Sequence, residues 1–349
     1  MFRTGSAAVT VAAILLAACV QDGAIAPEPA PQAAADAVPE PASASAAEPA
    51  AAMDAPAQPA APATAADPEP ASCALNGAFD HVTRNDGTRR VIFGEDGLMF
   101  RSDYAVNTDG APTSYHPDDP WGSSGLAINT VCNGVDIAAP EEVDYSQCKK
   151  LIDYFAQARD AGWTGADSPI VNFYGIATKS DTGEGRHQPC INDDPAYKGY
   201  FVSTTSQLAD PSRGRCDQGR YLNSLDLPFI IRPRGANFSG NGVDVGDLAL
   251  VMDPASGRQT FAIVGDIGPS WGLGEGSVYV SRALTGKATN PKTRKEVYGY
   301  GARNVLTLVF TGAPMKPPYT PERIEAAGKA ALERFGGQDR FNACAAELD

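Results

Sequence analysis

Two carboxylates, Asp266 and Glu275, stand nine positions apart, each beside a glycine, where an apolar run gives way to a turn. One carboxylic acid that donates a proton and one carboxylate that activates water are the groups needed to break a glycosidic bond. This pair is therefore our candidate catalytic site.

Each acid has a predicted role. Asp266 follows the apolar run 261–264, and partial burial would raise the pKa of its carboxyl, which suits a general acid. Glu275 lies between two glycines, remains accessible to water and is predicted as the base. Inversion at the sugar requires carboxyls about 6.5–9.5 Å apart, whereas a separation of about 5 Å favours retention. Alternatively, Asp266 caps a turn and Glu275 is only solvated.

Four further residues are candidates for substrate binding. Asp109, in Thr-Asp-Gly, could hold a substrate ammonium or act as an alternative base, although Asp-Gly is also a common turn pair. Trp271 lies between the two acids, where its ring could stack on a sugar or close the end of a barrel. Tyr115 and His116 are expected to line the cleft, with His116 in a structural role.

The elements that must position these residues are mainly strands. Helical spacing predicts one helix at about 146–158, and Thr320 followed by Pro321 predicts the start of a second. Short apolar runs predict strands at 97–101, 170–177, 199–204, 227–231, 247–252, 259–264, 277–280 and 304–310.

Two resemblances refine this prediction. The segments 246–269, 277–284 and 305–310 resemble a double-psi β-barrel. The chain also resembles glycoside hydrolase family 75, the chitosanase-like proteins, over about residues 98–312. The matching pieces are Asp109–His116, Gly199–Thr205, Arg220-Tyr-Leu-Asn, Leu227-Pro-Phe-Ile-Ile, Gly265–Pro269 and Gly274–Ser277.

These resemblances imply a mainly β fold, a six-stranded double-psi barrel with extended loops, a few packing helices and disulfides. The family-like domain would span 73–349, with a barrel core at about 170–312 and a helical tail at 320–349. The implied activity is endo-hydrolysis of a β-1,4-linked amino-sugar polymer by inversion, with Asp266 and Glu275 at the catalytic positions. The segment Cys132–Trp163 and the short loop between the two acids depart from the family pattern.

Seven cysteines occur, and setting Cys19 aside leaves six, which indicates three disulfides in an exported protein. Six cysteines allow 15 pairings. Our hypothesis is that Cys132–Cys148 and Cys190–Cys216 are local links and that Cys73–Cys344 joins the two ends. The spacing of cysteines and histidines does not match a zinc site, so we expect no metal and no cofactor.

The N-terminal region indicates export. Residues 1–18 have a basic start and a short apolar run, as in a secretory signal peptide. Cys19 after Leu-Ala-Ala resembles a bacterial lipobox, which implies lipidation of Cys19 and an outer-membrane, periplasmic or cell-surface location. The alternative is an ordinary signal peptide with an incidental cysteine. Residues 19–72, rich in alanine and proline, are predicted to be a disordered tether.

The formal net charge of −14 argues against nucleic-acid binding and favours a cationic polymer such as chitosan. Two alternatives remain open. The same site could act on peptidoglycan glycan strands, by hydrolysis or by lytic transglycosylation. The chain could also be a non-catalytic envelope lipoprotein that binds glycan.

Overall fold

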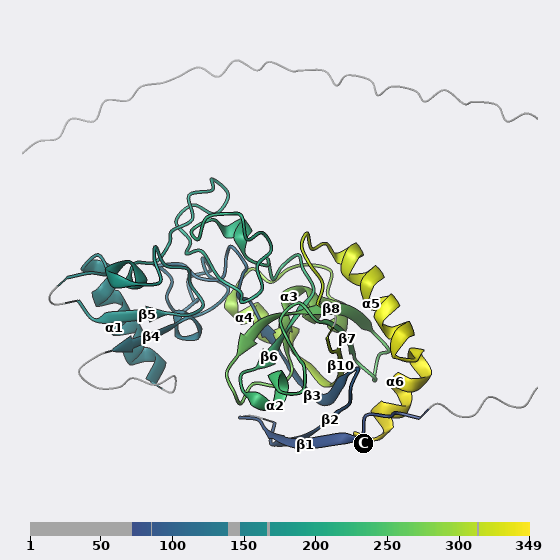
Figure 1. The fold of residues 1–349 in the computed structure, drawn as a ribbon. Helices are drawn as coiled ribbons and strands as arrows, with labels where there is room; N and C mark the ends of the chain where they lie inside the picture. The colour runs from purple at the N-terminus through teal and green to yellow at the C-terminus, as the bar shows by residue number, and fades with distance from the viewer. Residues whose placement is uncertain (1–71, 85, 139–146, 166–167, 313) are drawn as a thin grey trace, which may run out of the picture. The chain divides into compact units, whose positions relative to one another are not determined.

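Strands with largely continuous apolar runs close into a β-barrel in the computed structural model (Figure 1). The structure describes residues 72–84, 86–138, 147–165, 168–312 and 314–349. In order around the barrel, the strands are β3 (Leu98–Asn107), β10 (Ala302–Phe310), β7 (Leu248–Met252), β8 (Gln259–Gly268), β6 (Phe229–Pro233) and β9 (Glu275–Ser277), which pairs again with β3. The pairs β3–β9 and β6–β8 are parallel, and the other four are antiparallel. The predicted six-stranded double-psi barrel with packing helices is confirmed.

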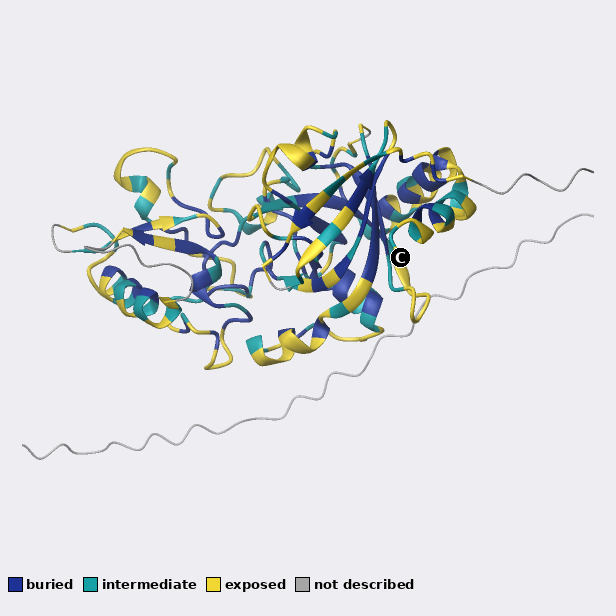
Figure 2. Ribbon diagram, turned by 90° about the horizontal axis from the view of Figure 1, so that it is seen from below, coloured by how far each residue is buried: buried dark blue, intermediate teal, exposed yellow. Residues whose placement is uncertain are grey.

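Alternation along the strands gives the barrel an inner and an outer apolar face. The inner face includes Leu98, Phe100, Ile230, Ala249, Val251, Ala262, Val264 and Val305. The outer face includes Met99, Phe229, Ile231, Leu250, Phe261, Ile263 and Leu308. Figure 2 shows the barrel strands largely buried, whereas the helices expose one side. The barrel is therefore filled by side chains, and a substrate site must lie on its outer surface or at its ends.

Helices α5 (Pro321–Phe335) and α6 (Gly337–Ala346) pack on the outer face of the barrel. The side chain of Thr320 accepts a hydrogen bond from the backbone N–H of Arg323, and Pro321 opens α5. This start agrees with the prediction. The remaining elements around the barrel are β1 (Gly77–Val82) and β2 (Thr88–Phe93), which extend the sheet beyond β3, and the helices α2 (Ala236–Ser239), α3 (Val278–Thr285) and α4 (Arg294–Val297).

Between β3 and β6 the chain forms residues 108–228, which we call the inserted lobe. Its own apolar core lies between α1 (Cys148–Asp160) and the two-stranded sheet of β4 (Val135–Ala138) and β5 (Ile170–Phe173). The predicted first helix is thus confirmed as α1. The lobe begins and ends at barrel strands that flank β9, so its loops return to the same part of the barrel.

The three disulfides have the pairing that we hypothesised from the sequence. Cys73–Cys344 joins the two ends of the described domain, while Cys132–Cys148 and Cys190–Cys216 lie within the inserted lobe. The first link crosses a sequence separation of 271 residues, and the other two cross 16 and 26.

Three of the sequence predictions differ from the structure. Residues 278–280, predicted as strand, begin helix α3, because the hydroxyl of Ser277 accepts from the backbone N–H of Val280 and caps a helix there. Residues 199–204 form only isolated bridges. The barrel is also not confined to about 170–312, since β3 precedes the inserted lobe and the pair β4–β5 belongs to that lobe.

Some predictions lie outside the described residues. These are the signal peptide (1–18), the lipidation site Cys19 and the predicted tether (19–72) except for its last residue. Among the helices that the structure describes, none has the length and apolar character needed to cross a membrane.

Candidate active site

Glu275 is the first residue of β9, and glycine fixes its position. Gly274 has a φ of +73°, and a Cβ there would overlap the carbonyl oxygen of Asp103, so only glycine fits. Glu275 pairs with Ala105 of β3, on the strand face opposite the barrel interior. Asn107, at the end of β3, donates its side-chain amide to Oε1 of Glu275 at 2.9 Å.

Asp266 reaches the same surface through a β-bulge in β8. Ile230 pairs with Val264, whereas Ile231 pairs with Asp266, so Gly265 is an extra residue in β8. An extra residue reverses the alternation that follows it. The side chain of Asp266 therefore lies on the outer face of the barrel with Ile231, and not on the inner face with Val264.

Three donors converge on Oδ1 of Asp266. They are the backbone N–H of Ser206 at 2.9 Å, the hydroxyl of Ser206, and the backbone N–H of Ile267 at 2.8 Å. Ser206 belongs to the inserted lobe, so the lobe supplies two of the three donors. These donors stabilise the ionised form of Asp266.

The two acids lie on the two strands that flank β6. Both β8 and β9 pair with β6, which places Asp266 and Glu275 two strand steps apart. Oε2 of Glu275 lies 3.7 Å from the position that a Cβ on Gly268 would occupy. Gly268 is two residues beyond Asp266 in the same strand, a rise of about 6.6 Å. The carboxyl of Glu275 therefore lies beside β8, close to the position two residues beyond Asp266.

Asp109 is a third carboxyl at this site. It lies two residues beyond the end of β3, and its Oδ1 accepts a hydrogen bond from the hydroxyl of Tyr115 at 2.6 Å. Its backbone N–H donates to Oδ1 of Asn107 at 2.7 Å, and the same asparagine donates to Glu275. The hydrogen bonds thus link Asp109 to Glu275 through one side chain.

Burial is the main influence on the ionisation of all three carboxyls. It raises the pKa of Glu275 to about 7, against the hydrogen bond from Asn107, and the negative charge of Asp266 adds to the rise. Burial also raises the pKa of Asp266, although its three hydrogen-bond donors oppose the rise. The pKa of Asp109 is raised well above its usual range by burial and by the charges of Asp266 and Glu275.

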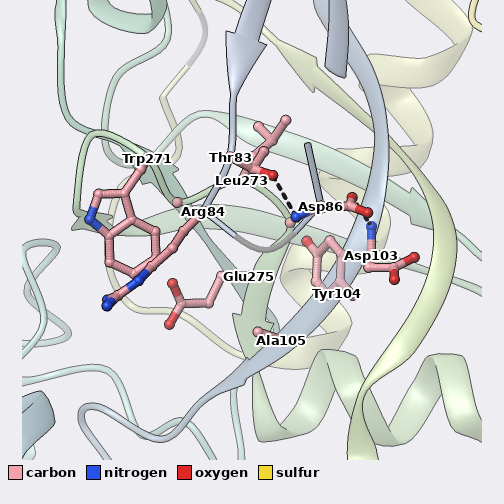
Figure 3. A pocket seen from close by; sticks show the side chains of 11 residues that line it. Thr83, Arg84, Asp86, Asp103, Tyr104, Ala105, Trp271, Leu273 and Glu275 are labelled. Atoms are coloured by element: carbon pink, nitrogen blue, oxygen red, sulfur yellow. Dashed lines mark hydrogen bonds between the residues drawn. The ribbon is translucent and has the colours of Figure 1, made fainter. Parts of the chain in front are cut away.

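A pocket of about 200 Å³ adjoins Glu275 on the side of the β1–β2 hairpin. Trp271 lines it with 43 % of its surface exposed, and the guanidinium of Arg84 lies 5.3 Å from the centre of the indole ring. Figure 3 shows Arg84 alongside Trp271, with the carboxylate of Glu275 close to both. The pocket therefore presents an exposed aromatic ring, a guanidinium and a carboxyl within one small volume.

The remaining predicted residues differ in position. Tyr115 is fully buried, so it reaches the site only through the hydroxyl that contacts Asp109. His116 packs edge-on against Tyr200, with ring centroids 4.8 Å apart, and its Nδ1 accepts from the backbone N–H of Asp118. It forms no hydrogen bond or ion pair with the three carboxyls. The structure therefore brings Asp109, Asp266, Glu275 and Trp271 together and leaves His116 apart.

Sequence reasoning missed Asn107 and Ser206, which hydrogen-bond to the acids. Asn107 precedes Asp109 by two residues, and a polar side chain at the end of an apolar strand was the available signal. Ser206 precedes Asp266 by sixty residues, and no local pattern connects the two.

Comparisons with known proteins add no assignment. No protein-family model matches the chain, and no curated protein matches it. The resemblances described above therefore rest on the residues of this chain alone.

Proposed function

We propose that this protein is an endo-acting, inverting glycoside hydrolase that cleaves a β-1,4-linked, chitosan-like amino-sugar polymer. The observation that supports the proposal is that Asp266 and Glu275 lie on the two strands that flank β6, near enough for the charge of Asp266 to act on Glu275, with different hydrogen-bond environments. Two carboxyls whose surroundings favour different protonation states are the usual basis for assigning an acid and a base.

The hydrogen bonds favour Glu275 as the acid and Asp266 as the base, the reverse of the roles predicted from sequence. Glu275 accepts one amide donor, and its raised pKa of about 7 keeps it largely protonated in mildly acidic solution. Asp266 accepts three donors that stabilise its anion. The acid would protonate the leaving oxygen while the base activates a water on the opposite side of the sugar.

The resemblance to glycoside hydrolase family 75 supports the same proposal, because Gly265–Pro269 and Gly274–Ser277 hold the two acids in the matching pieces. The pocket at Trp271 offers a stacking surface for a neighbouring sugar. The anion of Asp266 and the formal net charge of −14 favour a substrate that bears ammonium groups. Export also belongs to the proposal: three disulfides are compatible with an oxidising compartment, and Cys19 would carry the lipid.

The test is a reducing-end assay of the purified full-length protein on chitosan, chitin and peptidoglycan. We expect activity to be highest on chitosan. Glu275→Gln and Asp266→Asn should each lower kcat/KM by about 100- to 10,000-fold. Asp136→Asn, an exposed position in β4, is the matched control and should leave activity unchanged.

Each product identifies a different mechanism. NMR of fresh product should show the α-anomer, since inversion of a β-linkage gives that anomer. Anhydro sugar ends from peptidoglycan, together with an active Asp266→Asn variant, would indicate lytic transglycosylation, because that reaction needs the acid but no base to activate water. Binding to a glycan without release of reducing ends, unaffected by Asp266→Asn, would indicate a non-catalytic protein.

A further inference from the structure

A partly buried chain of hydrogen bonds in the inserted lobe ends at Asp109. The hydroxyl of Tyr115 donates to Oδ1 of Asp109 at 2.6 Å and accepts from the side-chain amide of Asn129 at 3.1 Å. The other end of Asn129 accepts from the backbone N–H of Thr130 at 2.8 Å and from the amide of Asn133 at 2.7 Å. A backbone N–H can only donate, so Oδ1 of Asn129 is the atom that faces it. The amide of Asn129 must then donate to Tyr115, whose own hydrogen is directed at Asp109.

The phenol ring has little freedom to turn elsewhere. Tyr115 has none of its surface exposed. A Cβ added at Gly134 would lie 3.2 Å from its hydroxyl oxygen, and one added at Gly175 would lie 3.1 Å from it. Two backbone segments of the lobe thus pack directly against the hydroxyl and hold it in place.

Asp109 is held on its backbone side as well. Gly110 has a φ of +81°, and a Cβ there would overlap the carbonyl oxygen of Leu222. Its backbone N–H donates to the hydroxyl of Ser203 at 2.9 Å. Among the described residues, Oδ2 of Asp109 has no hydrogen-bond partner, and the side chain remains partly exposed. One carboxyl oxygen is therefore fixed by the lobe, and the other remains available to a ligand.

We propose that Tyr115 is a positioning residue, supported by Asn129, that fixes the carboxyl of Asp109 with Oδ2 directed towards Asp266 and Glu275. When Asp109 is protonated, its hydrogen lies on Oδ2, since Oδ1 already accepts from Tyr115. Asp109 then donates a hydrogen bond to a sugar oxygen. The positioning is independent of the enzyme's activity, whereas its kinetic effect rests on the proposed function.

The electrostatic surroundings agree with this role. The groups that raise the pKa of Asp109 beyond the effect of burial are Asp266 on β8 and Glu275 on β9, and the hydrogen bond from Tyr115 opposes them. The pKa of Tyr115 is itself raised by burial and by Asp109, Tyr174 and Asp266. Removing the Tyr115 hydroxyl withdraws a donor from the anion of Asp109, so the pKa of Asp109 should rise further.

The test uses purified full-length protein with ¹³C-labelled aspartate carboxyls, titrated by NMR from about pH 3 to about pH 9. Loss of one signal in Asp109→Asn assigns the resonance of Asp109. We expect Tyr115→Phe to move the midpoint of that resonance to higher pH. Tyr154→Phe, in α1 and packed against the same lobe core, is the matched control and should leave it unchanged.

Kinetics give the second measurement. Tyr115→Phe should lower kcat about tenfold and change KM by less than about twofold. The other residues that contact the substrate are unchanged, but the carboxyl of Asp109 is less well positioned. If Tyr115→Phe does not fold, Asn129→Ala should move the titration in the same direction by a smaller amount.

The outcomes separate the two proposals. An unchanged Asp109 midpoint in a folded Tyr115→Phe or Asn129→Ala variant overturns the positioning role, whatever the activity. A wild-type protein that is inactive on every polymer refutes the glycosidase proposal, while a shifted midpoint in Tyr115→Phe would still support the positioning role.

Discussion

Glu275 and Asp266 carry the same functional group but differ in the donors around them. Glu275 accepts one amide hydrogen from Asn107, whereas Oδ1 of Asp266 accepts three. Partial burial raises the pKa of both side chains, and the extra donors offset more of this rise for Asp266. The difference arises from neighbouring residues, so the type of acid in the sequence does not reveal its role.

The residue-scale prediction concerns pH. Because Glu275 must be protonated to act as the acid, kcat/KM on chitosan should fall as pH rises through about 7, the raised pKa of Glu275. The measurement is kcat/KM of the full-length protein across pH 4 to 9, with ionic strength held constant. A rate that keeps increasing above about pH 8 would contradict the assignment of Glu275 as acid.

At the scale of elements, a strand bulge and a tight glycine turn bring the two acids together. Gly265 is the extra residue that turns Asp266 outward, and Gly274 lets the chain approach β3 before Glu275. Both acids are therefore placed by backbone geometry at strand ends.

The element-scale prediction uses two glycines with similar backbone angles. Gly274 has a φ of +73° and Gly257 a φ of +71°, but only a Cβ at Gly274 would meet neighbouring atoms. Gly274→Ala should lower the free energy of unfolding by about 2 kcal/mol or more and reduce activity about 100-fold. Gly257→Ala, the control, carries the backbone strain alone and should remain active. Thermal unfolding and the reducing-end assay measure both effects, and equal behaviour of the two variants would exclude the steric explanation.

The sequence predicted elements with strong local signals. The start of α5 followed from Thr320 and Pro321, and the central strands followed from long apolar runs. Strands β1 and β2 were missed because their residues are largely polar or partly exposed, and β9 because it has only three residues.

The sequence predicted only part of the candidate site, because only some of its residues are neighbours along the chain. Asp266 and Glu275 share one local motif, so their proximity was visible in the chain. The partners Ser206 and Tyr115 come from the inserted lobe, and only the folding of that lobe onto the barrel brings them to the acids. Single-sequence patterns do not contain such long-range contacts.

At the scale of the whole molecule, the raised carboxyl pKa values of Asp109, Asp266 and Glu275 lower the free energy of unfolding at high pH. A carboxyl whose pKa is higher in the folded state binds more protons there than in the unfolded chain. Stability is then greatest below the unfolded pKa and decreases as pH rises through the folded one. For Glu275, the rise from 4.5 to about 7 corresponds to on the order of 3 kcal/mol.

This linkage predicts that Glu275→Gln stabilises the protein at about pH 8, because the variant has no charge to bury. The gain in the free energy of unfolding should shrink towards zero near pH 4, where Glu275 is protonated in both states. Urea unfolding at the two pH values measures the gain. The exposed-site variant Asp136→Asn should show no such difference. A Glu275→Gln variant that is less stable at about pH 8 would contradict the buried charge.

The bond between Cys73 and Cys344 closes the described domain into a covalent ring spanning 271 positions. Tension on the chain before Cys73, such as the lipid anchor that we propose would transmit, enters at this sulfur bridge. The load then divides between the first strand and the last helix, so pulling cannot peel the hairpin β1–β2 away from its edge. Reducing agent would remove this protection and leave the hairpin as the first part to yield.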